Sequence, residues 1–406
     1  MRNNKKSILL VMSCAAVFGF LATASPAFAA GSEQTLYNFC NHGDNCAGIF
    51  PSGGLIFDTA GNLYSTTSQG GTSNEGTVFE LMPNGGVWTE QTLYNFCSAA
   101  NCADGSSPYG GVIFDTAGNL YGTTLGGGAY GQGTVFELVN NNGTWTEKVL
   151  HSFTGGDDGG APDAGLVIDA GGNLYGTTFS GGAYHSGTVF ELIPNNGTWT
   201  EKALHWFKAG AKPDCALVLD RSGNIYGTTA DGGIYGYGSV FELIPANGHW
   251  IEKVIHSFNI NSKGGYALFS GVILDSSGNL YGTTSRGGAF NGGTAFELTP
   301  GNGSWTLRIL VAFKPIQSAP VELSGLILGK SGNLYGTTRF GGAHFYGSVF
   351  ELIPNNGTWS EKLLFSFNQT DGEAPWNVIL DASGNLYGTT ENGGTYGYGT
   401  VFEVTP

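Results

Sequence analysis

The sequence predicts an all-β protein, a seven-bladed β-propeller of four-stranded antiparallel blades, and three observations lead to this prediction. A phrase close to GNLYGTT occurs seven times at intervals of 51 to 57 residues, beginning at Gly61, Gly118, Gly172, Gly223, Gly278, Gly332 and Gly384. Each interval contains several short runs of β-branched and aromatic residues, which is typical of a propeller blade. The two ends of the chain are also complementary, because the first run resembles a fourth strand and the last run a third.

Each repeat can be divided into four strands. In the second repeat we expect them at 110–115, 119–124, 133–138 and 145–153. Asp115 begins the connection between the first two strands, where an aspartate can cap the turn and the glycine before Asn119 can adopt a positive φ. An Asn-Gly pair between the third and fourth strands is a hairpin signal. Both connections are tight, so the four strands should form one meander.

The ends of the chain should close the ring. Residues 33–39 match the fourth strand of a repeat, and 399–404 match the third. Pairing them completes the last blade and leaves no open sheet edge. We therefore expect a single propeller domain over 30–406, with blades at about 53–97, 110–153, 164–207, 215–258, 270–313, 324–367 and 376–406.

Residues 1–29 differ from the repeats and predict a signal peptide. Three basic residues precede an apolar run over 8–23, and Ala27 and Ala29 are small residues at the positions that a signal peptidase reads. We expect cleavage after Ala29. The motif ending at Cys14 is a weaker alternative as a lipoprotein box, because the apolar run continues well beyond it.

Composition and charge restrict the function classes. Glycine accounts for 69 of 406 residues, but 41% hydrophobic and 13% aromatic residues can still build a core. The net charge of −15 becomes −18 when the three basic residues of the leader are removed. Such a charge disfavours nucleic acid and anionic membrane surfaces. We expect an exported, periplasmic or extracellular monomer without a membrane anchor.

Four cysteines occupy the same place in two successive repeats. Cys40 and Cys46 lie in one loop, and Cys97 and Cys102 in the next. Two local disulfides are the economical interpretation for an exported protein. Zinc is the alternative, although no CxxC spacing is present. Cys215 remains, and we expect it to pack as a small hydrophobic residue at the start of a strand.

The repeat units, GNLYGTT..GGAY..GTVFEL.PN.GTW.E..L..F, resemble the bacterial GloVer tandem repeat over 33–406 in seven copies. The D.SGNLY portion is also similar to NHL-type propeller repeats. The resemblance implies a propeller fold and an exported location, in a family whose members differ in how the C-terminus is anchored. It implies no reaction.

Paired carboxylates would suggest sugar hydrolysis, but 19 of the 31 acidic residues fall at three repeat positions. A group present in nearly every blade is more plausibly architectural than catalytic, so we predict no catalytic residue. No metal or cofactor motif is recognisable either. The sixth repeat lacks two of these acids, with Gly329 and Leu307 in their place, and the sequence offers no reason.

We expect any ligand at the end of the ring that carries the variable loops. The loops between the second and third strands have the frame GG-x-x-x-x-G, and their second x is Ser73, Tyr130, Tyr184, Tyr235, Phe290, His344 or Tyr396. The six residues from Tyr130 to Tyr396 are candidate ligand contacts, or else these side chains cover the glycine backbone. Arg286 and Arg339 follow GTT closely in the fifth and sixth repeats. They could bind an anionic substituent or reduce the repulsion in an acidic protein.

These observations favour a non-enzymatic exported protein that binds a glycan or an envelope or extracellular protein through the variable loop face. One alternative is a carbohydrate-active hydrolase or lyase with a site in the central funnel. Another is a structural component of the envelope or matrix. Non-repeated polar residues gathered at one point would distinguish these classes, and in the sequence such departures are scattered.

Overall fold

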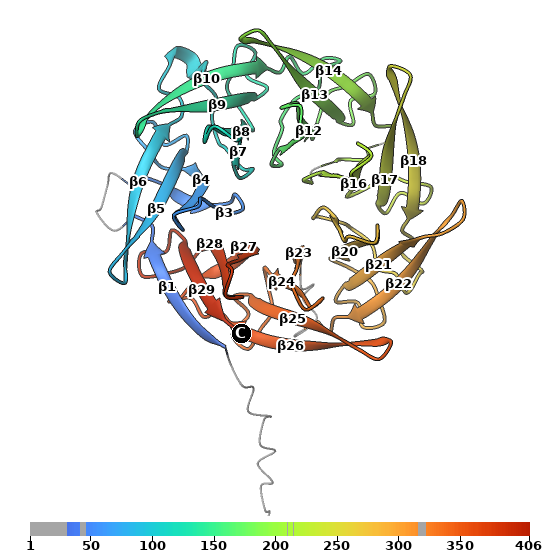
Figure 1. Cartoon of the computed structure of the whole chain (residues 1–406). Coiled ribbons are helices and arrows are strands. Elements are labelled where there is room, and N and C mark those ends of the chain that lie inside the picture. Colours follow the sequence, from blue (N-terminus) through green and yellow to red (C-terminus); the bar gives the residue numbers. More distant parts are fainter. Residues whose placement is uncertain (1–30, 41–45, 209, 214, 316–321) are drawn as a thin grey trace, which may run out of the picture.

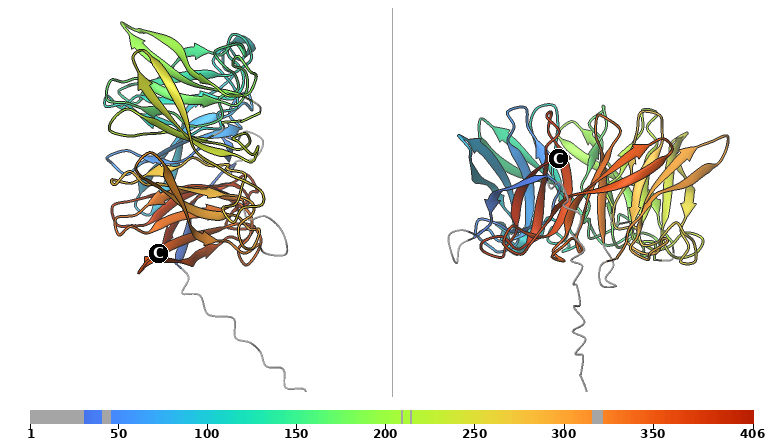
Figure 2. Two further views of the ribbon diagram at one scale, coloured as in Figure 1. Left: turned by 90° about the vertical axis from the view of Figure 1, so that its right-hand side faces the viewer. Right: turned by 90° about the horizontal axis from the view of Figure 1, so that it is seen from below.

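The computed structural model describes residues 31–40, 46–208, 210–213, 215–315 and 322–406. Their strands form seven antiparallel sheets arranged in a ring around a central axis (Figure 1). Seen from the side, the ring is a disc whose connections gather at its two faces (Figure 2). The fold is thus a seven-bladed β-propeller, as the repeats predicted. The predicted signal peptide at 1–29 lies outside the described residues.

Blades one to four each run outward from the centre. Their strands are β2 (Ile49–Pro51), β3 (Ile56–Phe57), β4 (Leu63–Gln69), β5 (Thr77–Asn84) and β6 (Val87–Asn95) in blade one; β7 (Ile113–Phe114), β8 (Leu120–Thr124), β9 (Thr134–Asn141) and β10 (Thr144–Ser152) in blade two; β11 (Val167–Ile168), β12 (Leu174–Thr178), β13 (Thr188–Asn195) and β14 (Thr198–Trp206) in blade three; and β15 (Val218–Leu219), β16 (Ile225–Thr229), β17 (Ser239–Ala246) and β18 (His249–Ser257) in blade four. A short 3-10 helix, η1 (Ala100–Cys102), lies between blades one and two.

Blades five to seven repeat this order. They contain β19 (Ile273–Leu274), β20 (Leu280–Thr284), β21 (Thr294–Pro300) and β22 (Trp305–Ala312); β23 (Leu323–Leu328), β24 (Leu334–Thr338), β25 (Ser348–Asn355) and β26 (Thr358–Ser366); and β27 (Glu373–Leu380), β28 (Leu386–Asn392), β29 (Thr400–Thr405) and β1 (Ser32–Asn38). β1 pairs antiparallel with β29, from Ser32 opposite Thr405 to Asn38 opposite Thr400. The predicted closure of the ring by the N-terminal strand is confirmed.

Acids at two of the three repeated positions form one hydrogen-bonded unit with a tyrosine. In blade three, Asp169 accepts hydrogen bonds from the backbone N–H groups of Gly171 and Asn173, at 2.8 and 2.9 Å, and so caps the turn between β11 and β12. The Tyr175 hydroxyl lies 3.1 Å from the Asp169 carboxylate and 2.9 Å from that of Glu191. These carboxylates are therefore committed to the architecture of the blade.

In blade six the corresponding tyrosine hydroxyl finds its hydrogen-bond partner although the aspartate is missing. Tyr335 and the side-chain amide of Asn333 both donate to Glu351, at 3.0 and 2.6 Å. A Cβ atom added at Gly329, where the aspartate would stand, lies 2.8 Å from the Tyr335 ring. As placed in this blade, the ring therefore leaves no room for a side chain at residue 329.

The core lies between neighbouring blades. Between blades one and two, for example, Val78 and Phe96 pack against Leu120 and Phe136, all with exposed fractions near zero. A Cβ atom added at Gly122, in the GNLYGTT phrase, would lie 2.6 Å from the Phe136 ring. The glycine of GTT is therefore required by close packing against a phenylalanine of the next strand.

The threonine after that glycine joins each blade to the next near the axis. At six boundaries its hydroxyl donates to a backbone carbonyl just before, or near the beginning of, the first strand of the following blade, over 2.8 to 3.3 Å. The donors are Thr66, Thr123, Thr177, Thr228, Thr283 and Thr337. At the remaining boundary Thr389 is buried, and its hydroxyl finds no partner in the described part of the chain.

Candidate functional site

A cavity of about 500 Å³ lies on the ring axis and is lined by residues of all seven blades. Most of its wall comes from residues just before the first strands of blades one to five and from the beginnings of β23 and β27 in blades six and seven. Ser285 and Arg339, directly after β20 and β24, and Glu391, near the end of β28, complete it. Antiparallel connectivity places these residues at the end of the ring where the fourth-to-first and second-to-third connections run. The cavity therefore opens within the face that carries the variable loops.

One position of the cavity wall carries chemically different side chains. It follows a proline and is Ser52, Tyr109, Asp163 and Trp376 in blades one, two, three and seven, and Phe269 follows a leucine at this place in blade five. In blades two to seven a neighbouring backbone carbonyl accepts the threonine hydroxyl of the preceding blade. This bond uses the backbone alone and leaves the side chain free to vary.

Blades six and seven differ from the others at this point. Pro108 and the buried Val112 of blade two are four residues apart, but Pro375 and the buried Val378 of blade seven are only three. Pairing with the second strand consequently extends inward, and β27 is eight residues long whereas β7 has two. The shorter connection places Trp376 beside blade six, where its carbonyl accepts the Thr337 hydroxyl at 2.8 Å.

A charged cluster joins blades six and seven inside the cavity. The Arg339 guanidinium donates to the Glu391 carboxylate, and its Nε lies 3.9 Å from Glu322 Oε2. Its Cζ lies 4.1 Å from the centroid of the Trp376 ring, a cation–π contact. Arg339 and Glu391 occupy the same repeat position in adjacent blades. The side chain of Arg339 is only 21% exposed, so both carboxylates act on it at reduced dielectric.

Several buried polar atoms beside the cavity find no hydrogen-bond partner among the described residues. They are Arg339 Nη1, Trp376 Nε1, Ser285 Oγ and Ser52 Oγ. Native proteins satisfy most buried polar atoms, and the exceptions need an explanation. Unsatisfied donors next to a cavity are typical of a site that is completed by ligand or water.

Of the eight predicted ligand contacts, the structure places one at the cavity and seven outside it. Arg339 lines the cavity, whereas Arg286 is exposed and does not. The loop residues Tyr130, Tyr184, Tyr235, Phe290 and Tyr396 are 47 to 63% exposed, His344 is exposed as well, and none of them lines the cavity. Lys208 lies 5.0 Å from the Tyr184 ring and Lys314 lies 5.1 Å from the Phe290 ring. These rings stay candidates for a second, outer contact surface.

Sequence reasoning missed Tyr109, Phe269, Trp376, Glu322 and Glu391. A signal was present, because the residue after the proline and the residue after GTT both change chemical class among the repeats.

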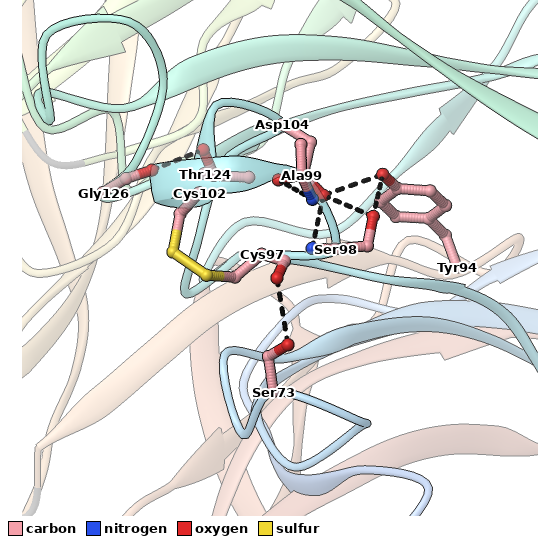
Figure 3. Close-up of a disulfide and its surroundings, with 9 residues drawn as sticks. All are labelled: Ser73, Tyr94, Cys97, Ser98, Ala99, Cys102, Asp104, Thr124 and Gly126. Atoms are coloured by element: carbon pink, nitrogen blue, oxygen red, sulfur yellow. Dashed lines mark hydrogen bonds between the residues drawn. A yellow bond between two sulfur atoms is a disulfide. The ribbon is translucent and has the colours of Figure 1, made fainter.

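Both predicted disulfides are present, Cys40–Cys46 and Cys97–Cys102. The second lies in a loop organised by Asp104, which accepts hydrogen bonds from the Tyr94 hydroxyl and the Ser98 backbone at 2.8 and 2.9 Å (Figure 3). Burial acts to raise the pKa of Asp104, but these hydrogen bonds outweigh it and the pKa is lowered.

The disulfides leave no thiolate of these four cysteines for zinc. Across the described ranges there is also no cluster of three or more metal-ligating residues. Cys215 is buried and lines the cavity three residues before β15, not at the start of the strand as predicted. None of the helical structure in the described residues has the length and apolar character to cross a bilayer.

The fold and site define a closed seven-bladed propeller with a central, variably lined cavity. The chain belongs to the Gloeobacter/Verrucomicrobia repeat family, whose sequence profile matches residues 19–138, 51–273 and 268–406. No curated protein matches the chain in sequence.

Solved structures are similar in fold. The extracellular domain of a proposed hybrid two-component system from B. thetaiotaomicron matches with a TM-score of 0.55 at 13% identity, over 91% of this chain and 39% of that chain. A proposed 6-phosphogluconolactonase from Bacteroides uniformis matches with a TM-score of 0.52 at 15% identity, over 82% of this chain and 88% of its own. A Lactobacillus plantarum protein matches with a TM-score of 0.54 at 14% identity, over 81% and 88%. At these identities the likeness extends to the fold alone.

Proposed function

We propose that this protein is an exported, non-enzymatic binding protein that takes a glycan into the central cavity of its variable loop face. The observation that carries the proposal is that chemically different side chains from six blades converge on one cavity, namely Ser52, Tyr109, Asp163, Phe269, Arg339 and Trp376. A purely architectural propeller would have no reason to vary the chemistry of these side chains.

The chemistry of the cavity supports a sugar as the ligand. Tyr109 and Phe269 are 37% and 48% exposed at its wall and offer flat apolar faces on which a pyranose ring can stack. Carboxylates and hydroxyls around them can fix the orientation of the ligand by hydrogen bonds. A volume of about 500 Å³ lies within the usual range for small-ligand sites.

Export is supported by the disulfides, which persist in oxidising compartments. The basic and apolar leader at 1–29 is of the kind that directs secretion. A glycan of the envelope or of the surroundings would then be within reach of the mature protein.

The test is a glycan array followed by titration calorimetry on the mature protein, 30–406, with turnover assayed on every glycan that binds. We expect binding without turnover, and we expect Tyr109→Ala combined with Phe269→Ala to weaken it at least tenfold, since each stacked ring contributes about 1 kcal/mol or more. Tyr130→Ala combined with Tyr235→Ala is the matched control, because these exposed rings lie outside the cavity.

Each other outcome overturns the proposal in a distinct way. Loss of binding only in the control variant would move the site to the outer loop aromatics. Turnover would replace the proposal with the hydrolase or lyase alternative, for which Asp163, Glu322 and Glu391 would be the first carboxylates to test. Absence of binding to any glycan, with retention in an envelope extract, would favour a structural or protein-binding role.

A further inference from the structure

The charge of the cavity restricts the kind of glycan it can accept. The described lining residues contain three carboxylates, on Asp163, Glu322 and Glu391, against the single guanidinium of Arg339, a formal charge of −2. The chain as a whole carries −15. An anionic sugar would therefore meet a repulsive potential both on approach and inside the site.

Arg339 does not offset this potential for a ligand. Its guanidinium is already bonded to Glu391 and faces Glu322 at 3.9 Å, so only Nη1 is left to donate to a ligand. A flat face of the guanidinium is occupied by the Trp376 ring at 4.1 Å. An arginine whose charge is shared between two carboxylates and an indole is a poor anion receptor, because a ligand carboxylate or sulfate would have to compete with both.

The same contacts give Arg339 a different role. Trp376 is held between the backbone of its short connection, through the bond from Thr337, and the guanidinium stacked on its ring. Trp376 lines the cavity and is partly exposed to it. Arg339 thus fixes the orientation of an aromatic wall residue, and the two glutamates fix Arg339.

We infer that the cavity recognises an uncharged glycan, with Trp376 as a stacking contact and Arg339 as the residue that positions it. This inference rests on the proposed function, whose site it refines. It contradicts the sequence-based hypothesis that Arg339 binds an anionic substituent.

The experiment compares neutral and acidic oligosaccharides of matched length. Mature protein is titrated with gluco- and manno-oligosaccharides and with oligogalacturonides, at low and at physiological salt. We expect the neutral series to bind, with affinity that changes less than about twofold between the two salt concentrations because no net charge is neutralised. The acidic series should bind at least tenfold more weakly, and added salt should narrow that gap.

Variants assign the roles. Trp376→Ala should weaken the neutral series about tenfold, as expected for the loss of one stacked aromatic. Trp376→Phe, which keeps an aromatic ring, should weaken this binding less than Trp376→Ala does. The matched control is Trp206→Phe, on the outer strand β14, where the indole N–H donates to the Asp157 carbonyl away from the cavity. It should leave the affinity unchanged.

Arg339→Met should weaken the neutral series to a similar extent, and Arg339→Lys, which cannot stack as a planar group, should restore it only in part. Quenching of tryptophan fluorescence by the ligand should diminish in both Arg339 variants. A merely structural role for Arg339 would leave the quenching amplitude unchanged once the variant is folded and saturated.

The outcomes separate the two proposals. Tighter binding of the acidic series, lost in Arg339→Met, would overturn the inference and leave the proposed function intact. Neutral binding that is unaffected by Trp376→Ala would overturn the roles given to Trp376 and Arg339. Binding of neither series nor of any other glycan would overturn the proposed function and the inference with it.

Discussion

The side chain of Asn38 accepts a hydrogen bond of 2.7 Å from the backbone N–H of Thr395, across 357 residues of chain. Asn95 makes the corresponding bond to Thr72 within blade one, at 3.0 Å. The closing blade is therefore held by the same interaction as a blade that is continuous in sequence. Closure depends on β1 keeping its place without covalent help from β29.

Removing the apolar anchor of β1 should open the ring. Leu36 is buried against Phe79 and Leu81 of the neighbouring blade. We expect Leu36→Ala to lower the free energy of unfolding by about 3 kcal/mol, because a large buried side chain is lost and a cavity remains. The measurement is guanidinium unfolding followed by tryptophan fluorescence. Gln34 is exposed on the same strand, and Gln34→Ala should change the free energy of unfolding by less than about 0.5 kcal/mol. Equal losses in both variants would contradict the role of Leu36.

The repeated tyrosine should be a structural donor wherever it occurs. Burial and then the hydrogen bond and charge of Glu191 raise the pKa of Tyr175 far above its usual value, so its hydroxyl keeps its proton. We expect Tyr175→Phe to cost about 1 to 3 kcal/mol of stability, since a buried carboxylate loses a donor. Thermal and chemical unfolding would measure the loss. Tyr235→Phe, at an exposed loop position, is the control, and an equal effect there would refute the explanation.

The outer strands should make stability depend on pH. Burial, followed by the negative charge of Asp104, raises the pKa of Glu147 to about 7, and Glu147 Oε1 is buried without a partner in the described part of the protein. The folded protein thus binds this proton more tightly than the unfolded chain, whose carboxyl titrates near 4.5. The stability associated with the protonated group is complete below pH 4.5 and is lost as pH rises through 7.

Glu147→Gln tests this assignment because it keeps the shape of the protonated acid at every pH. We expect the variant to be more stable than the natural protein at pH 8, on the order of 1 kcal/mol after allowance for partial solvent exposure, and equal to it at pH 4.5. Unfolding curves at both pH values would show it. Asp157→Asn, at an exposed side chain, should give no such difference. A gain that persists at pH 4.5 would mean that packing, not ionisation, is responsible.

The repeated residues predicted most of the fold because the same packing and turn contacts recur in each blade. Gly122 needs to be glycine against Phe136, and Asp115 caps its turn with hydrogen bonds from Ala117 and Asn119, so each blade repeats the same letters. The first strand was predicted too long. It was expected over 110–115 but pairs only at Ile113–Phe114, because nearer the axis the carbonyl of Gly110 bonds to Thr66 of the previous blade and not to a strand of its own sheet.

The cavity could not be predicted in the same way. Its lining residues stand about one repeat apart in sequence and meet only because the ring closes. Arg339 and Glu391 are 52 residues apart and pair because they occupy equivalent positions on adjacent blades. Trp376 follows a proline as Tyr109 does, but its connection to the buried valine of the strand is one residue shorter, so the repeat alone does not give its position. Repeated residues identify what the fold requires, whereas the distinctive side chains of the cavity lie at positions that do not repeat.

The loop between blades one and two should depend on Asp104 more than on its disulfide. Cys97 and Cys102 close a loop so short that the bond restricts the unfolded chain by about 2 kcal/mol. Asp104 is buried and also receives hydrogen bonds from the Ser98 hydroxyl and the Ala99 backbone, at 2.9 and 3.2 Å. Its loss would leave two backbone N–H groups and the Tyr94 hydroxyl without their acceptor.

We therefore expect Asp104→Ala to cost about 3 kcal/mol, and the double variant Cys97→Ser with Cys102→Ser to cost at most about 2 kcal/mol. Guanidinium unfolding of both variants, with and without a reducing agent, would rank them. The reductant should destabilise Asp104→Ala and the natural protein equally, while the double variant should respond less, through Cys40–Cys46 alone. A double cysteine variant less stable than Asp104→Ala would show that the covalent bond, and not the buried carboxylate, holds this loop in place.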